Sequence, residues 1–467
     1  MSKIFGELLE KFGNNPALIT ESGEEITYAE FLSNADEIAS RADRRDVVFQ
    51  VCRNDAESVT AYAGFLRNGV VPLLISDTTN ADMFENLKET YRPSYIYLPS
   101  ADGGKHGESV YEFGGYSLIR TGYEIDYAVR DDLALLLTTS GSTGSPKLVR
   151  ITYANIESNT GSIIEYLGIT PRDRAITTMP MSYTYGLSII NTHLQAGAAL
   201  ILTDRTLMER GFWSMLKTHK ATTFSGVPYT FEMLKKLRFE RMELSCLRYL
   251  TQAGGKLSPE LCAEFIEICE RKGIEFIVMY GQTEATARMA YLPWKYAKFK
   301  PASMGIAIPG GEFRLAGDDG GRVKSSGVVG ELFYKGANVT PGYAENRFDL
   351  SKGDERGGIL ETGDMARFDE DGFFYIVGRK KRFLKIFGNR VNLDEVEGIL
   401  KKAGFDCAVA GTDDNMRIFT TFEKTDDVRQ FILSGTGINP AGFSVTRIDA
   451  IPRNSSGKVL YAELADL

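Results

Sequence analysis

The first 280 residues alternate helical patterns with short apolar runs, and this alternation constrains the fold more than any other feature of the sequence. Residues 28–42, YAEFLSNADEIASRA, repeat apolar side chains at helical spacing, and the apolar runs DVVFQVC and VVPLLIS follow at residues 46–52 and 70–76. Buried strands that alternate with helices form parallel sheets, because a parallel pair needs a crossover that a helix supplies. We therefore predict an α/β fold whose large N-terminal region contains mixed, largely parallel sheets flanked by helices.

The pattern changes near residue 310. Short strands separated by glycine follow, EFRLAG, GELFYKG and GFFYIVG, and they predict a small β-rich subdomain. After Gly378 the basic run RKKR precedes alternating segments that suffice for a compact α+β module of about 85 residues. We expect an N-terminal domain over residues 1–379, with its β subdomain from about residue 310, and a small mobile C-terminal domain over residues 380–467.

A polar, glycine-rich loop follows the apolar run LALLL at residues 133–137. Glycine lets backbone N–H groups approach an anion, hydroxyl groups add donors and a lysine adds positive charge, so the segment TTSGSTGSPK suits a polyphosphate. The predicted phosphate ligands are Thr139, Ser140, Gly141, Ser142, Thr143, Gly144 and Lys147. The spacing of the two glycines differs from that of a Walker-type loop, which excludes a Walker NTPase. A flexible linker would explain the glycines but not the buried-strand run before them.

Composition excludes several other classes of protein. Lys and Arg number 54 against 62 Asp and Glu, a net charge of −8, which argues against a nucleic-acid binder. The five cysteines form no C-x-x-C pair, so we expect neither a disulfide framework nor a zinc site, as in a reducing cytosol. The three histidines give little basis for an imidazole metal centre. No run of about 18 apolar residues and no signal peptide occurs, so we predict a cytoplasmic protein without a membrane span.

Six further motifs occur in a fixed order along the chain. They are ITYAEF at residues 26–31, YGQTEAT at 280–286, GELFYKG at 330–336, ETGD at 361–364, GRKKRFLKIFGNRV at 378–391 and PRNSSGK at 452–458. Together with the glycine-rich loop they resemble the adenylate-forming superfamily of acyl-CoA synthetases, luciferases and nonribosomal-peptide adenylation domains. The resemblance covers nearly the whole chain and implies that ATP activates a carboxylate as an acyl-adenylate, with pyrophosphate leaving.

Such a reaction needs charge stabilisation and in-line positioning more than a side-chain nucleophile. The resemblance implies that Glu284 is a Mg²⁺ ligand and that Thr283 contacts the α-phosphate and the metal, and oxygen ligands suit this hard cation. Without the motif around it, Glu284 is equally well explained as a charge at a helix N-terminus.

The resemblance also implies where the nucleoside binds. Tyr280 stacks on adenine, two glycines after the run LRYLTQ line the base pocket, and Asp364 accepts hydrogen bonds from the ribose hydroxyls with assistance from Arg379. Taken alone, the tripeptide TGD is an ordinary turn. The predicted nucleoside ligands are Gly254, Gly255, Tyr280, Gly281, Asp364 and Arg379.

Two lysines of the predicted C-terminal domain would serve the two half-reactions. The resemblance implies that Lys458 bridges the substrate carboxylate and the α-phosphate during adenylation, although its Ser/Gly-rich loop alone would suggest disorder. Lys385 and Gly388 match the segment that the family presents to the site after the domain rotates. Lys381 falls at the hinge position, where charge alone would indicate a solvated turn.

The segment PMSYTYG at residues 180–186 departs from the family pattern. Tyr183 stands where acyl-CoA synthetases commonly carry histidine, and Thr184 stands where amino-acid-activating domains carry aspartate. An α-amino acid is therefore disfavoured, because its buried ammonium would lack a counter-charge. The predicted pocket residues are Tyr183, Tyr185, Ser225, Gly226 and Val227, and Tyr185 is equally well explained as a core aromatic residue.

These observations predict an AMP-forming ligase that uses Mg²⁺ and ATP and passes an acyl group from a small carboxylic acid to a thiol. Coenzyme A is the default acceptor, since the chain ends nine residues after Lys458 and carries no fused carrier domain. A free-standing carrier protein or an amine acceptor fits the sequence equally well. A rival of another class is an adenylate-binding protein without turnover, against which the presence of Lys147, Glu284, Asp364 and Lys458 argues.

Overall fold

A computed structural model describes residues 4–104, 106–138, 147–317, 319–387, 389–436, 438–453 and 459–465. The chain divides into two compact units, the first formed by Met1–Phe313 with Tyr334–Leu360 and the second by Arg314–Phe333 with Glu361–Leu467. The predicted boundary between residues 379 and 380 stays a prediction.

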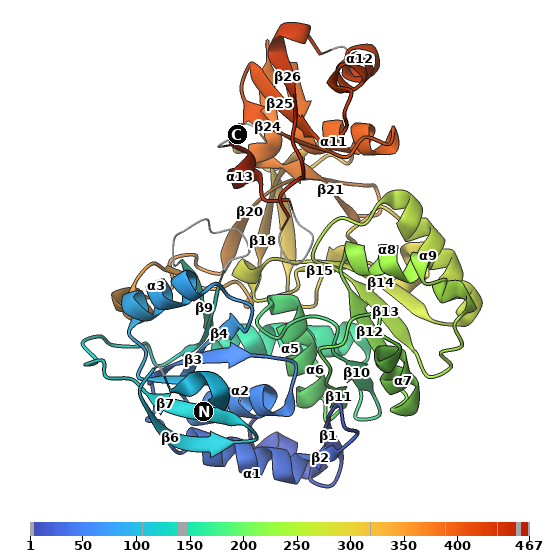
Figure 1. Ribbon diagram of the computed structural model, residues 1–467. Helices are drawn as coiled ribbons and strands as arrows, with labels where there is room; N and C mark the ends of the chain where they lie inside the picture. Colours follow the sequence, from blue (N-terminus) through green and yellow to red (C-terminus); the bar gives the residue numbers. More distant parts are fainter. Residues whose placement is uncertain are drawn as a thin grey trace. The chain divides into compact units, whose positions relative to one another are not determined.

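The first unit contains two large sheets (Figure 1). In the described part of the chain, one sheet has nine strands in the order β16-β15-β14-β13-β12-β10-β11-β1-β2. Its strands are β1 (Pro16–Ile19), β2 (Glu25–Thr27), β10 (Arg174–Ile176), β11 (Ala199–Ile201), β12 (Thr223–Gly226), β13 (Tyr249–Gln252), β14 (Glu275–Tyr280), β15 (Ala290–Tyr291) and β16 (Ile306–Ala307). Pairing is parallel from β14 to β1 and antiparallel at both edges.

The other large sheet has eight strands among the described residues, in the order β19-β9-β8-β4-β3-β5-β7-β6. Its strands are β3 (Val47–Cys52), β4 (Val71–Ser76), β5 (Tyr95–Pro99), β6 (Glu108–Phe113), β7 (Tyr116–Arg120), β8 (Leu133–Thr138), β9 (Leu148–Thr152) and β19 (Gly342–Ala344). The central strands β8, β4, β3 and β5 pair in parallel, and the outer pairs are antiparallel. The predicted mixed, largely parallel character is therefore confirmed.

The helices of the first unit begin and end at recognisable sequence signals. They are α1 (Tyr28–Ala39), α2 (Ala56–Asn68), α3 (Ala81–Tyr91), α4 (Ser100–Gly103), α5 (Tyr153–Leu167), α6 (Thr184–Gln195), α7 (Arg210–Thr218), α8 (Pro228–Lys236), α9 (Pro259–Lys272) and α10 (Trp294–Ala297), with 3₁₀ turns η1 (Glu7–Phe12), η2 (Phe239–Arg241), η3 (Thr283–Ala285) and η4 (Arg347–Ser351). Thr27 and Thr152 form capping boxes at the starts of α1 and α5. Gly168 ends α5 in the left-handed conformation, as a helix C-terminus commonly requires.

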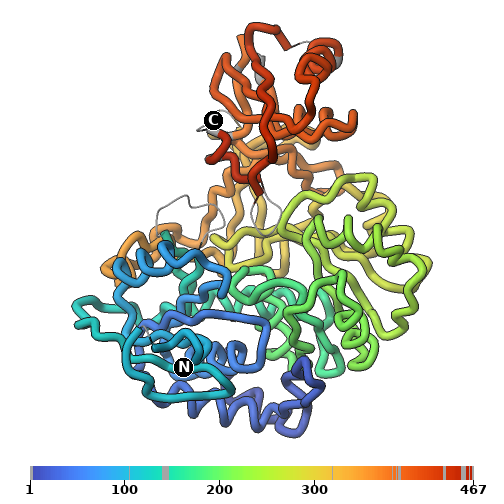
Figure 2. Tube along the Cα trace, viewed as in Figure 1, coloured from blue at the N-terminus to red at the C-terminus, as the bar shows by residue number. Residues whose placement is uncertain are grey.

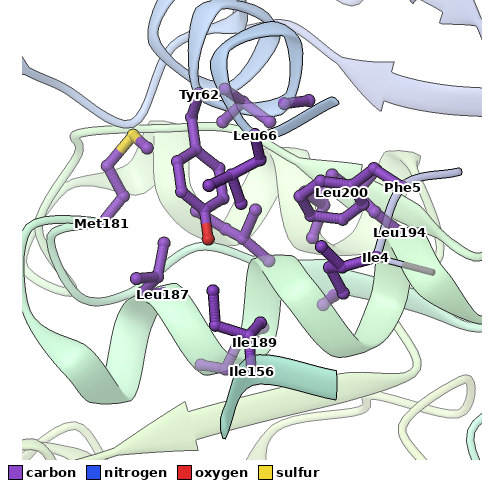
Figure 3. Close-up of a cluster of buried hydrophobic side chains, with 14 of the residues drawn as sticks. Ile4, Phe5, Tyr62, Leu66, Ile156, Met181, Leu187, Ile189, Leu194 and Leu200 are labelled. Carbon is purple, nitrogen blue, oxygen red and sulfur yellow. The ribbon is translucent and has the colours of Figure 1, made fainter. Parts of the chain in front are cut away.

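The main core of the first unit lies between its two sheets, where Figure 1 shows α5 and α6. In Figure 3, Tyr62 extends from α2 toward Leu187 and Ile189 of α6, and its hydroxyl donates to Asn191 Oδ1 at 2.9 Å. Segments distant in sequence meet here: the blue start of the chain and the green strand β11 lie side by side in Figure 2, with Leu18 opposite Leu200. The burial of these apolar faces drives the packing of the layers.

The second unit is smaller and has an α+β composition. The division between the units passes through strands of the four-stranded sheet, whose order is β17-β18-β20-β21. Later in the chain come the pair β22-β23 and the three-stranded sheet β24-β25-β26. The elements are β17 (Glu312–Ala316), β18 (Gly330–Lys335), β20 (Ile359–Phe368), β21 (Phe374–Arg379), η5 (Lys380–Arg382), β22 (Phe383–Ile386), β23 (Asn389–Asn392), α11 (Leu393–Lys402), β24 (Cys407–Thr412), β25 (Asn415–Thr420), α12 (Thr425–Thr436), η6 (Pro440–Gly442), β26 (Phe443–Arg447) and α13 (Tyr461–Ala465).

A separate core of Val396, Leu400, Ile418 and Ile432 holds the α+β part of this unit together. The predicted fold class, with large sheets, a small β-rich region and a small α+β region, is confirmed. Across the described ranges, no helix is both long enough and apolar enough to cross a membrane.

Candidate active site

The carboxyl ends of three adjacent parallel strands bring predicted pocket and nucleoside residues to one edge of the nine-stranded sheet. Gly226 at the end of β12 is opposite Gln252, which is opposite Val278 of β14. Gly254 follows β13, and Tyr280 ends β14. Ligands of open α/β sheets bind at this edge, so the sheet topology supports the position of the predicted site.

Gly254 lies where Tyr183 and Val227 meet. Its φ is +81°, and a Cβ atom there would be 2.7 Å from Tyr183 Oη and 3.0 Å from Val227 Cγ1. The neighbouring Gly255 faces Pro228, at 3.1 Å from an added Cβ. Predicted pocket and nucleoside residues are thus direct neighbours, and a side chain at residue 254 would displace both.

Gly281 is required by the fold of the turn that follows it. A Cβ atom there would be 1.7 Å from the carbonyl oxygen of Ala287, so no other residue fits without a backbone shift. Tyr280 beside it accepts a hydrogen bond from Gln282 Nε2 at 3.2 Å and lies 6.5 Å from the Phe313 ring. The predicted contacts of Tyr280 and Gly281 with adenine stay predictions.

The turn at residues 283–287 is strained and held from several sides. Thr286 has φ +66°, a left-handed conformation that is rare for a β-branched residue. Its N–H donates to the Thr283 carbonyl at 3.0 Å, its hydroxyl donates to the Asn338 carbonyl at 2.7 Å, and its carbonyl accepts from the Thr184 hydroxyl. Asn338 Nδ2 also donates to the Ala285 carbonyl at 2.9 Å. Such strain persists where the surroundings over-determine a conformation, as they commonly do at functional sites.

Glu284 is presented by this turn and fixed by its neighbours. Its Oε1 accepts from the Tyr343 hydroxyl at 2.7 Å, and its carbonyl accepts from Thr340 N and Oγ1, both at 3.0 Å. Arg356 Nη1 also donates to this carbonyl, at 3.3 Å. One carboxylate oxygen is thus oriented by Tyr343, and the other makes no hydrogen bond with the described residues.

Tyr343 joins Glu284 to Lys147. Lys147 Nζ lies 4.0 Å from the centre of the Tyr343 ring and 3.7 Å from Glu345 Oε1, and the Arg356 guanidinium lies 4.7 Å from the same ring. The ring face attracts both cations. Burial, with Glu284 beside the hydroxyl, raises the pKa of Tyr343 to about 12, so this group stays a proton donor. Sequence reasoning missed Tyr343 and Arg356, since neither belongs to a motif quoted for the site.

The donor set at Glu284 suits a hard divalent cation. Mg²⁺ binds through one or two carboxylates together with phosphate oxygens and water, and a single free carboxylate oxygen on a fixed turn meets that need. Within the described ranges, no group of three or more His, Cys, Asp or Glu side chains is arranged around a common point that could hold a metal. A Mg²⁺ ion held by this one carboxylate would take further ligands from the phosphates and from water.

Several predicted site residues lie outside the described residues. They are Thr139, Ser140, Gly141, Ser142, Thr143, Gly144, Gly388 and Lys458. The side chains of Lys381 and Lys385 are likewise not described. Arg453 and Val459 pair as an isolated antiparallel bridge. The roles predicted for all these residues stay predictions.

The predicted pocket residues are neighbours, and two of them belong to a buried polar network. Tyr185 is 2% exposed, and its hydroxyl lies 3.0 Å from the Thr251 carbonyl and 2.9 Å from Thr251 Oγ1. Ser225 Oγ lies 2.8 Å from the same Thr251 Oγ1. Tyr183 is only half-buried and packs edge-on against Tyr185, with ring centres 6.4 Å apart.

Arg288 is a further residue of this region that sequence reasoning missed. Its guanidinium carbon lies 3.8 Å from the centre of the Tyr185 ring. The available signal was an arginine within the otherwise small and apolar segment ATARMAY, four residues after Glu284.

In the second unit, Asp364 and Arg379 are cross-strand neighbours. They are opposite each other in the antiparallel pair β20-β21, and Arg379 Nε lies 2.7 Å from Asp364 Oδ1. Asp364 is buried, whereas Arg379 is largely exposed. The structure thus brings together the two residues predicted to bind ribose, although the role itself stays a prediction.

The sequence of this chain is similar to the sequences of known enzymes. Residues 5–344 match the family described as AMP-binding enzyme. The chain is 29% identical over 350 residues to 2-succinylbenzoate–CoA ligase of Geobacillus sp. (strain WCH70), an alignment covering 72% of this chain and 69% of that protein. It is 31% identical over 268 residues to indoleacetate–CoA ligase of Aromatoleum aromaticum, covering 57% of this chain and 51% of that protein.

A solved structure matches the whole fold. The o-succinylbenzoate CoA synthetase of Bacillus subtilis, in complex with its acyl-adenylate intermediate, has a TM-score of 0.81 at 22% identity and covers 100% of this chain and 98% of that chain. The fold and the family match together define an ATP-dependent, AMP-forming acid–thiol ligase. The chain belongs to the AMP-binding enzyme family, and the predicted resemblance and enzyme class are confirmed.

Proposed function

We propose that this enzyme forms an acyl-adenylate from a small organic carboxylate and ATP and then passes the acyl group to coenzyme A. The observation that carries the proposal is the cluster of Lys147, Tyr343 and Glu284, in which one tyrosine joins a cation suited to phosphate and a carboxylate suited to Mg²⁺. The relatives named above, and an oxalate–CoA ligase of Saccharomyces cerevisiae at 27% identity, are all CoA ligases of carboxylates.

In the first half-reaction, a carboxylate oxygen bonds to the α-phosphorus while the bond to the pyrophosphate oxygen breaks. Lys147 neutralises the departing pyrophosphate, Thr283 contacts the α-phosphate, and the fixed turn holds Glu284 toward the phosphates. Preorganised groups of this kind lower the barrier because they need no rearrangement as charge develops. Mg²⁺, held by Glu284, would neutralise charge on the phosphate oxygens. Asp364 and Arg379 would bind the ribose.

In the second half-reaction, the sulfur of coenzyme A attacks the acyl carbon, the bond to the AMP oxygen breaks and the thiol proton passes to solvent. We propose that residues 380–467 rotate about Lys381, so that Lys458 serves the first step and the segment with Lys385 and Gly388 serves the second. A free-standing carrier protein finds no support among the CoA ligases to which the chain is similar. We also propose a cytoplasmic location, because an odd number of cysteines does not indicate the disulfide framework of a secreted protein.

The test is carboxylate-dependent exchange of pyrophosphate into ATP, measured without coenzyme A over aliphatic, aromatic, hydroxy and amino acids. Exchange with one class of acid, followed by AMP and thioester formation once coenzyme A is added, supports the proposal. Exchange followed by acyl transfer only to a holo-carrier protein or to an amine overturns the proposal that coenzyme A is the acceptor. Binding of ATP without exchange for any acid supports the non-catalytic alternative.

A further inference from the structure

Arg288 is a buried cation without a carboxylate partner. Arg288 is 3% exposed, and its Nε atom is buried without a hydrogen bond. No ion pair with Arg288 occurs among the residues that the structure describes. A buried charge without a counter-charge is costly, so an arginine in this state needs an explanation.

Two other buried arginines of this chain have the compensation that Arg288 lacks. Arg150 pairs with Glu355 at 2.5 Å and donates to main-chain carbonyls, including that of Tyr343 at 3.1 Å. In the second unit, Arg382 pairs with Asp394 at 2.8 Å and Glu397 at 2.7 Å. Arg150 and Arg382 thus have carboxylate partners, whereas Arg288 has none among the described residues.

The Arg288 side chain lies over one tyrosine ring, and its charge acts on two further tyrosines. Its guanidinium carbon lies 3.8 Å from the centre of the Tyr185 ring, and its positive charge opposes the rise that burial gives to the pKa of Tyr166. Burial raises the pKa of Tyr183, and the positive charge of Arg288 opposes that rise. An aromatic ring compensates a cation only partly, and its face does not use the hydrogen-bond donors of the guanidinium.

The backbone of Arg288 is fixed, so the side chain starts from a defined point. Asn159 Nδ2 donates to the Arg288 carbonyl at 2.8 Å, and Asn159 Oδ1 accepts from the Arg288 N–H at 3.2 Å. Asn338 Nδ2 donates to the same carbonyl at 3.0 Å. A site that binds a charged group needs such support around the residue that makes the contact.

We propose that Arg288 binds a second carboxylate on the acid substrate, so that the enzyme activates dicarboxylic acids. This inference rests on the proposed function. Arg288 lies over the ring of Tyr185, a predicted pocket residue that packs edge-on against Tyr183, so the cation borders the region assigned to the acyl group. A guanidinium binds a carboxylate through two parallel hydrogen bonds, which a lysine cannot reproduce.

The reacting carboxylate and the phosphates are assigned to other groups. Glu284 lies at the other end of the turn from Arg288 and is bound by Tyr343, whose ring lies under Lys147, whereas the Arg288 guanidinium lies over the Tyr185 ring. The two ends of one short turn would thus serve the two ends of the substrate.

The experiment compares diacids with their monomethyl esters in pyrophosphate exchange. The series is the α,ω-diacids from oxalate to adipate, together with phthalate, each tested beside its monomethyl ester. We expect at least one diacid to exceed its ester by about 30-fold in kcat/KM in the wild-type enzyme. In Arg288→Met the ratio should fall to about one through a higher KM for the diacid, whereas exchange with the ester changes little. Arg288→Lys should retain an intermediate ratio.

Arg248→Met is the matched control. Arg248 also lies over a tyrosine ring, at 5.0 Å from the centre of Tyr249, but it is paired with Asp173 at 2.9 Å. This variant should lose stability and keep the wild-type ratio. If the wild-type enzyme uses esters or monocarboxylates as well as it uses diacids, the inference is overturned and the proposed function stays intact. This comparison needs only the wild-type enzyme, so it does not depend on whether any variant folds. Absence of exchange with every acid overturns both.

Discussion

The hydroxyl of Tyr343 donates to Glu284 Oε1 at 2.7 Å, and Lys147 Nζ lies 4.0 Å from the centre of the same ring. One side chain therefore fixes the distance between a carboxylate suited to Mg²⁺ and a cation suited to phosphate. Because burial and Glu284 raise the pKa of Tyr343 to about 12, this link persists across the pH range of an ordinary assay.

Tyr343→Phe removes the hydrogen bond and keeps the ring beside the cations. We expect about a tenfold loss of kcat/KM in pyrophosphate exchange and a higher Mg²⁺ requirement, because Glu284 is no longer oriented. The free energy of unfolding should fall by about 1 kcal/mol. The measurement is exchange as a function of Mg²⁺ concentration.

Tyr91→Phe is the control for this variant. The Tyr91 hydroxyl donates to the carbonyl of Ala344, the residue next to Tyr343, at 2.7 Å. Its loss should lower stability by a similar amount and leave the Mg²⁺ dependence unchanged. An unchanged Mg²⁺ dependence in Tyr343→Phe itself would show that the hydrogen bond does not orient the metal ligand.

Gly281→Ala should disrupt the turn that presents Glu284. The added Cβ would be 1.7 Å from the Ala287 carbonyl, so the backbone must move, and we expect at least about 100-fold lower exchange together with a loss of about 2 kcal/mol of stability. Gly161→Ala is the control, since nothing lies within 4 Å of its added Cβ in α5 and a helix gains up to about 1 kcal/mol from this change. Wild-type exchange in Gly281→Ala would contradict the role given to the turn.

His193 should make stability depend on pH below neutrality. The imidazole is buried in α6, and burial lowers its pKa from 6.5 to about 4, so the folded state holds it neutral. Between these values the unfolded chain binds the proton and the folded protein does not. Stability from this group is therefore complete above pH 6.5 and is lost as the pH falls toward 4, by about 3 kcal/mol in total.

The measurement is urea unfolding from pH 7.5 to pH 4.5 in the wild-type protein and in His193→Gln. The difference in unfolding free energy between the two should change by about 1.4 kcal/mol per pH unit below 6.5. His219→Gln is the control, because His219 is partly exposed. Parallel pH profiles for the wild-type protein and His193→Gln would remove His193 as the cause.

The sequence predicted the architecture because its signals are local. The capping box at Thr27 and the left-handed glycine at residue 168 mark helix ends through neighbouring residues alone. The alternation of apolar runs and helical patterns likewise predicted the parallel central strands of both large sheets. Local propensity and fold agree throughout these segments, as expected of a foldable chain.

The candidate site was only partly predictable because several of its contacts are not local. Glu284 was identified from its motif, but its partner Tyr343 is 59 residues away, and Thr184 lies 102 residues from Thr286, whose carbonyl it binds. Arg288 follows a predicted motif directly, yet its importance arises from burial and from the absence of an ion pair, neither of which a pattern of letters records. Motifs thus identified candidate residues, and the fold shows which of the described side chains contact one another.

Lys458→Ala should separate adenylation from acyl transfer. In the proposed mechanism this lysine stabilises charge only in the first half-reaction, so its loss should cost adenylation about 3 kcal/mol, a fall of about 150-fold in pyrophosphate exchange. Transfer from a chemically prepared acyl-adenylate to coenzyme A should stay near the wild-type rate. Lys381→Pro is the complementary variant, because restricting φ at the proposed hinge should spare exchange and slow transfer. Equal losses in both half-reactions for either variant would rule out the proposed division of labour between the two conformations.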